Sequence, residues 1–150
     1  MYINSVINQL KIAVDSTVIM FERIEESKLL TKPLKGATSE LCEHISLLIA
    51  ADINILNGKT ETEMKDFYNE NSGRSLEEMK VQLLTSFKNL VEIYSNYTSQ
   101  ELFEIKKAYW GVSYSRYEWL LEILVHFYHH RAQLHMLIRE QIDGGFSLFE

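Results

Sequence analysis

The sequence predicts an all-α protein, a four-helix bundle with a long crossover between the second and third helices. Apolar residues recur at three- and four-residue steps over four long segments, which is typical of amphipathic helices. The chain contains one proline and six glycines, and the glycines fall between or after these segments, where helices commonly end. Segments of roughly 18 to 27 residues correspond to helices of about 27 to 40 Å, the usual dimensions of such a bundle.

Length and composition fit a single soluble domain that spans residues 1–150, with 46% hydrophobic and 24% charged residues. The net charge of -6 and the lack of a Lys/Arg run argue against a nucleic-acid partner. Cys42 is the only cysteine, which fits a reducing compartment. The chain shows no signal-peptide pattern and no apolar run near the ~20 residues that span a bilayer. We therefore expect a cytoplasmic protein without a membrane partner.

The first two predicted helices are apolar along one face. The first runs from about Asn4 to Ser27, and a connection containing Pro33 and Gly36 follows. The second runs from about Ser39 to Leu56. The expected inward residues are Ile7, Leu10, Val14, Val18, Phe21 and Ile24 in the first helix, and Leu41, His44, Leu48, Ala51 and Ile55 in the second.

Residues 59–74 are polar and aperiodic, so we expect them to form a long connection, which suits a crossover between helices better than a tight hairpin. Ser75–Glu78 then has the pattern of a capping box, in which the serine and the glutamate satisfy two backbone N–H groups at the start of a helix. This box opens the third helix, whose expected inward residues are Leu76, Met79, Leu83, Phe87, Leu90 and Tyr94.

Two further capping boxes follow. Thr98–Glu101 predicts a short helix that continues through Ala108, and Ser115–Glu118 opens the last helix, which we expect to end at Asp143–Gly145. Aromatic residues crowd the start of that helix, and core or homodimer packing is their expected role, with a substrate pocket as the alternative. They are Tyr109, Trp110, Tyr114, Tyr117, Trp119, Phe127 and Tyr128.

Four of the five histidines lie in the last helix. His126 and His130 stand four residues apart, so they project from one face of the helix and two imidazoles can reach one metal ion. The expected inward stripe is Trp119, Ile123, His126, His130, Gln133 and Leu137. The fifth histidine, His44, lies on the apolar stripe of the second helix. Because a buried imidazole needs partners for its ring nitrogens, we predict that these three histidines meet around a metal ion in the core.

Other partners could also satisfy these rings, namely one another, a water molecule or Glu122. If a metal is bound, Gln133, His129 and Glu122 are expected beside its ligands, and the sequence does not identify a general base. Arg131 turns away from the histidine pair, so we expect it at the surface or in an interhelical ion pair.

The segment HFYHHRAQLHMLIRE, together with His44 in LCEHI, resembles the DinB/YfiT-like superfamily of four-helix-bundle metalloproteins. The late family motif reads approximately H-x-x-x-H-R-G-Q. Here it stands as His126, His130, Arg131, Ala132 and Gln133, with alanine in place of the usual glycine. The resemblance implies a divalent ion held by the three histidines, zinc being the expected ion and nickel, manganese or iron the alternatives.

The resemblance also implies candidate functions. Some relatives are transferases or isomerases that use a low-molecular-weight thiol such as bacillithiol, mycothiol or glutathione. Three neutral imidazoles leave zinc one or two open positions, where the pKa of a water or thiol falls. We therefore expect a metal-dependent thiol S-transferase or a hydrolase of a small-molecule substrate. The alternatives are a non-catalytic, stress-related metal-binding or interaction protein, and a bundle whose histidines only fill the core.

Overall fold

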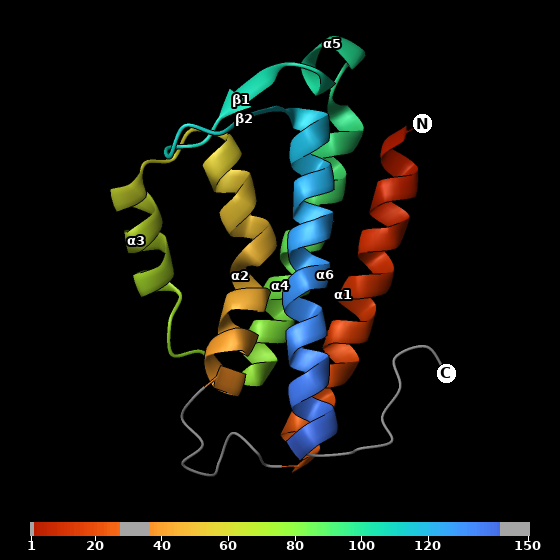
Figure 1. Cartoon of the computed structure of the whole chain (residues 1–150), viewed down its shortest axis with the longest axis vertical. Coiled ribbons are helices and arrows are strands. Elements are labelled where there is room, and N and C mark those ends of the chain that lie inside the picture. Colours follow the sequence, from red (N-terminus) through yellow and green to blue (C-terminus); the bar gives the residue numbers. More distant parts are fainter. Residues whose placement is uncertain (1, 28–36, 142–150) are drawn as a thin grey trace.

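The computed structural model describes residues 2–27 and 37–141. Its four long helices are α1 (Tyr2–Ser27), α2 (Ala37–Leu56), α4 (Leu76–Asn96) and α6 (Arg116–Gln141), and they form one bundle (Figure 1). The predicted all-α fold is confirmed. The expected connection at Pro33 and Gly36 and the expected helix end at Asp143–Gly145 lie outside the described residues.

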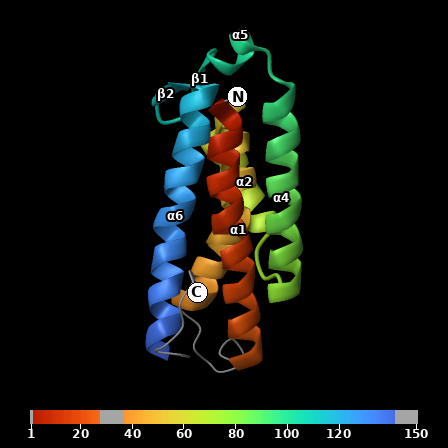
Figure 2. The same ribbon diagram turned by 90° about the vertical axis from the view of Figure 1, so that its right-hand side faces the viewer.

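The helices of the bundle run in two pairs of opposite direction. In Figures 1 and 2, α1 and α6 descend whereas α2 and α4 ascend. α2 packs against both α4 and α6, and α1 packs against the same two helices from the other side. Since α2 and α4 are parallel, the chain between them must travel back along the bundle, as the predicted crossover requires.

The crossover is more ordered than the sequence predicts, because it contains α3 (Glu61–Glu70). Thr60 caps this helix, and its side-chain oxygen accepts a hydrogen bond from the backbone N–H of Glu63 at 3.2 Å. Met64 is 2% exposed, and Phe67 and Tyr68 pack against the core. The polar, aperiodic sequence of residues 59–74 did not indicate this helix, which three apolar side chains about one turn apart hold against α2.

The short helix expected through Ala108 was wrong beyond its first turn. α5 covers Ser99–Leu102, and the chain then forms strand β1 (Ile105–Lys107), which pairs antiparallel with β2 (Ser113–Ser115). Gly111 turns the hairpin with a φ of +101°, a conformation that side-chain-bearing residues rarely adopt.

The three predicted capping boxes are all present. In the first, Ser75 and Glu78 each accept a hydrogen bond from the other's backbone N–H, and the box at Thr98 has the same reciprocal pattern. In the third, Glu118 N–H donates to Ser115 Oγ and Ser115 N–H donates to Glu118 Oε1, both at 3.1 Å. These bonds satisfy backbone donors that a helix start otherwise leaves unpaired.

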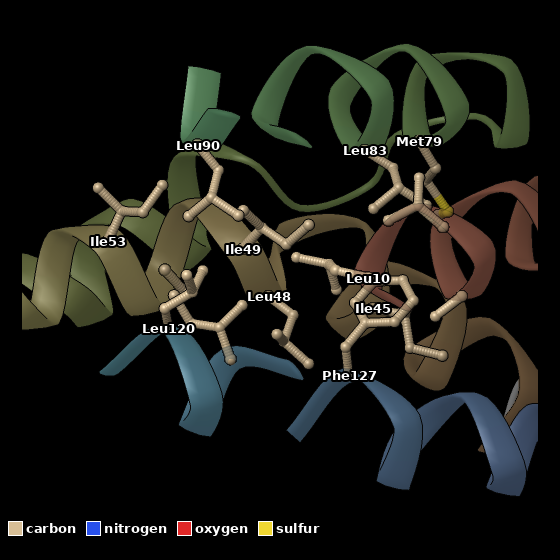
Figure 3. Close-up of a cluster of buried hydrophobic side chains, with 14 of the residues drawn as sticks. Leu10, Ile45, Leu48, Ile49, Ile53, Met79, Leu83, Leu90, Leu120 and Phe127 are labelled. Atoms are coloured by element: carbon tan, nitrogen blue, oxygen red, sulfur yellow. The ribbon is translucent and has the colours of Figure 1, made fainter. Parts of the chain in front are cut away.

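The core lies where the four helices meet (Figure 3). Leu10, Ile45, Leu83 and Phe127, one from each long helix, are fully buried. Burying a side chain of this size stabilises the fold by roughly 1.5–3 kcal/mol. No helix in the described part of the chain combines the length and hydropathy needed to cross a bilayer.

The buried face of α6 differs from the predicted stripe. It consists of Trp119, Leu120, Ile123, Phe127, Arg131, Leu134 and Ile138. His126 and His130 are only half-buried and Gln133 is exposed, so the expectation of core positions for them was wrong. The larger apolar side chains Phe127 and Leu134 occupy the centre of the bundle, and this rotation of α6 places the histidine pair at its margin, beside α2.

Candidate metal centre

His44, His126 and His130 come together across the interface between α2 and α6. Each contributes one ring nitrogen to a group in which all these atoms lie within 4.8 Å of one another. The ring centroids of His44 and His130 are 4.5 Å apart, and those of His44 and His126 are 5.8 Å apart. The predicted meeting of three imidazoles from two distant parts of the chain is therefore present, in a half-buried setting.

Asp52 was missed in the sequence and is a buried polar partner of this group. Its Oδ2 lies 2.9 Å from Nδ1 of His126, and the residue is only 6% exposed. The sequence carries one signal for it, because Asp52 is the only charged residue in the run Ile45–Leu56. A carboxylate in such an apolar run needs a hydrogen-bonding partner once the helix is buried.

These hydrogen bonds define which ring nitrogens remain available on α6. An ionised carboxylate accepts hydrogen bonds and cannot donate them, so Nδ1 of His126 carries the proton. Nδ1 of His130 likewise lies 2.8 Å from the amide oxygen Oε1 of Gln133. In the neutral form of both rings, Nε2 then has a free lone pair, which is what a metal ion requires of an imidazole.

The environments of the histidines shift their pKa values in opposite directions. The hydrogen bond that His126 donates to Asp52 raises the pKa of His126, aided by the negative charges of Asp52 and Glu122 and opposed by burial. Burial, followed by the nearby His130 and His126, lowers the pKa of His44. The lowered pKa favours the neutral form of His44, in which an imidazole can donate a lone pair to a cation.

A pocket of about 670 Å³ adjoins the histidines and opens to solvent. Its lining is mainly apolar, and Glu40 is its one carboxylate among the described residues. The lining consists of Glu40, Leu41, His44, His130, Gln133, Met136 and Leu137. Glu40 and Leu41 precede His44 along α2, whereas Asp52 follows it, so the pocket and Asp52 lie on opposite sides of the histidine group along the bundle axis.

The remaining candidates occupy different positions. His129 is exposed, with its ring centroid 5.0 Å from that of His130, and it is not part of the three-histidine group. Glu122 is exposed and acts on His126 through its charge. Arg131 contradicts the expectation of a surface residue, because it is 4% exposed and its Nε donates to Ser16 Oγ on α1 at 2.7 Å.

Several of the aromatic residues pack at the hairpin end of the bundle. Trp119 is buried, its Nε1 donates to the carbonyl of Lys106 at 3.0 Å, and its ring contacts those of Trp110 and Tyr114. None of the aromatic residues singled out in the sequence lines the pocket beside the histidines, as far as its described walls extend. The contacts of Trp119 therefore fasten the β-hairpin to α6.

The donor set is chemically suited to a divalent ion. Three imidazoles are a common ligand set for zinc, whose Zn–N distances of about 2.0–2.1 Å place tetrahedral ligands roughly 3.3 Å apart. The three nitrogens all lie within 4.8 Å of one another, a separation of the same order. The fold and the site thus define a helical-bundle protein with a three-histidine group that is compatible with metal binding.

Comparison with known proteins identifies its family. The model of the DinB family matches residues 24–141, and the chain belongs to that family. A DinB family member from Exiguobacterium sibiricum has a similar structure, with a TM-score of 0.77 and 27% identity over 97% of this chain and 96% of that one. A DinB-like protein from Bacillus cereus shares the fold, with a TM-score of 0.68 and 22% identity over 100% and 99% of the two chains. No curated protein matches the chain significantly.

Proposed function

We propose that this protein binds one divalent metal ion, zinc in the first instance, through His44, His126 and His130, and uses it to act on a small molecule. The reaction classes are transfer of a low-molecular-weight thiol to an electrophile and hydrolysis. The observation that carries this proposal is the group of three imidazoles, two of which, those of His44 and His130, line a mainly apolar pocket. A site that served only to hold the fold together would not need such a pocket.

The residues around such a site have different roles. A divalent ion held by three imidazoles supplies a Lewis acid that lowers the pKa of a water or thiol reaching it. Leu41, Met136 and Leu137 provide an apolar wall for the carbon skeleton of the substrate. Glu40 disfavours an anionic group in that part of the pocket, because its carboxylate would repel it.

Metal binding is tested first. Untagged protein is freed of metal with a chelator, dialysed against zinc and analysed for bound metal by elemental analysis. We expect one ion per chain, and we expect His44→Ala, His126→Ala and His130→Ala each to lose it. His135→Ala, which removes a histidine of α6 outside the group, is the matched control. Correctly folded wild-type protein that takes up no zinc would contradict the proposal.

Catalysis is tested next with the zinc-loaded protein. One set of assays offers a low-molecular-weight thiol with apolar electrophiles, and the other offers apolar esters and amides without a thiol. We expect turnover in one set, lost in His44→Ala and retained in His135→Ala. Tight binding of one zinc ion with no turnover in either set would refute the catalytic half of the proposal. His129→Ala then shows whether a fourth protein ligand closes the site.

A further inference from the structure

We propose that Asp52 is a positioning residue for the metal centre. Its carboxylate holds the ring of His126 with the proton on Nδ1, so that Nε2 faces the ion. This inference rests on the proposed function, since it assigns a task at the same three-histidine site. It concerns a residue that the family motif in α6 does not contain, because Asp52 lies on α2.

The position of Asp52 suits this task. It follows His44 by eight residues on the same helix, which corresponds to about 12 Å along the axis. Since α6 runs antiparallel to α2, His126 lies next to Asp52, and His130 lies next to His44 at the pocket end. The bond between Asp52 and His126 thereby ties a ring of α6 to the helix that carries the third ligand.

The burial of Asp52 makes the contact specific. A carboxylate that is 6% exposed in an apolar helix is costly unless it is hydrogen-bonded, and the described partner of Asp52 is a ring of the metal-binding group. Gln133 offers a contrast on the neighbouring ring, because it is exposed, uncharged and on the same helix as His130. Asp52 therefore supplies both an interhelical anchor and a negative charge near the cation, whereas Gln133 supplies neither.

A carboxylate behind a ligating histidine has two general effects on a metal site. It fixes the tautomer and the orientation of the ring, and it makes the other ring nitrogen a stronger donor. Loss of such a partner typically weakens metal binding 10- to 100-fold. We expect a loss of this size for Asp52→Ala. Asp52→Asn keeps the shape and one hydrogen bond but removes the charge, so we expect an intermediate loss.

The experiment uses full-length protein with these two variants and Asp15→Asn as the matched control. Asp15 is an exposed carboxylate on α1 whose described partner is Lys11, so its replacement removes a charge outside the histidine group. Zinc affinity is measured by competition with a chromophoric chelator. The tautomer of His126 is read in the metal-free protein from the ¹⁵N chemical shifts of its ring nitrogens, which report on the ring itself and not on the stability of the fold.

In wild type and Asp15→Asn, the expected signature is a protonated Nδ1 on His126. In the Asp52 variants, we expect a mixture of tautomers together with the loss of affinity. Unchanged zinc affinity and an unchanged His126 tautomer in Asp52→Asn would overturn the inference. If Asp52→Ala does not fold, Asp52→Asn alone provides the test. If wild type binds no zinc, the proposed function fails, while the tautomer measurement still tests the contact itself.

Discussion

Replacing Ser16 by alanine probes the buried contact that fixes the rotation of α6. Ser16 is 7% exposed, its Oγ donates to the carbonyl of Ala13 at 3.0 Å, and it accepts the 2.7 Å hydrogen bond from Arg131 Nε. The Arg131 guanidinium also lies 5.2 Å from the ring of Tyr128. Because Arg131 directly follows His130, the contact with α1 helps to set the direction in which His130 points.

The expected cost of Ser16→Ala follows from the loss of one hydrogen bond to a buried charged group. Such bonds contribute about 1.5–3 kcal/mol to the free energy of unfolding. Near 2 kcal/mol, the urea midpoint falls by about 1 M if the slope is about 2 kcal/mol per M. The melting temperature falls by about 4–8 °C for a chain of this length.

Urea unfolding followed by circular dichroism at 222 nm measures this cost. Ser46→Ala is the matched control, because Ser46 is 2% exposed and its Oγ also donates to a carbonyl one turn earlier, that of Glu43 at 2.7 Å. Ser46→Ala loses the equivalent bond from a serine hydroxyl to a carbonyl of its own helix. Unlike Ser16, Ser46 accepts no hydrogen bond from an arginine among the described residues. Equal midpoints for the two variants would refute the assigned role of the contact between Ser16 and Arg131.

Three further predictions concern separate parts of the molecule. Burial raises the pKa of the Cys42 thiol to about 12, so a disulfide reagent at pH 8 should label the folded chain far more slowly than the urea-unfolded chain. Thr60→Ala should destabilise α3 by about 1 kcal/mol through loss of its N-cap, seen as faster amide exchange in that helix. In metal-free protein, NMR titration should place the pKa of His126 above its ordinary value of 6.5 and that of His44 below it.

The raised pKa of His126 has a defined consequence for stability. It stabilises the folded state below pH 6.5, and this contribution is lost as the pH rises through the folded-state pKa. The lowered pKa of His44 has the opposite effect, because it reduces the free energy of unfolding as the pH falls below 6.5. Asp52→Asn should therefore reduce the free energy of unfolding more at pH 5.5 than at pH 8.5. A pH-independent difference between this variant and wild type would contradict the assignment.

Local sequence patterns were sufficient to predict the four long helices. Their apolar periodicity and the capping boxes at Ser75 and Ser115 are properties of neighbouring residues, and they do not depend on what packs against them. The same logic applies to α3, whose N-cap residue Thr60 and apolar triplet Met64, Phe67 and Tyr68 are present in the sequence. That helix was overlooked because most of its residues are polar, so its three apolar positions give only a weak periodic signal. The hairpin was missed because strands of three residues leave almost no periodic signal.

The candidate site was predictable only in part, for a physical reason. The four-residue spacing of His126 and His130 fixes their common face, but the rotation of α6 depends on how Phe127, Leu134 and Arg131 fill the bundle. The same holds for Asp52, whose pairing with His126 follows from the axial register of α2 and α6. No pattern within one helix encodes that register, since it results from packing between helices.

The crossover has a consequence for the order in which the protein folds. The contact between Asp52 and His126 joins positions 74 residues apart, and α3, α4, α5 and the hairpin all lie between them in the chain. Closing so long a loop is entropically costly, so the two halves of the site meet only when most of the bundle is assembled. A ligand bound there should chiefly slow unfolding and leave the folding rate almost unchanged. The unfolding rate of the native protein would then indicate whether a ligand occupies the three-histidine site.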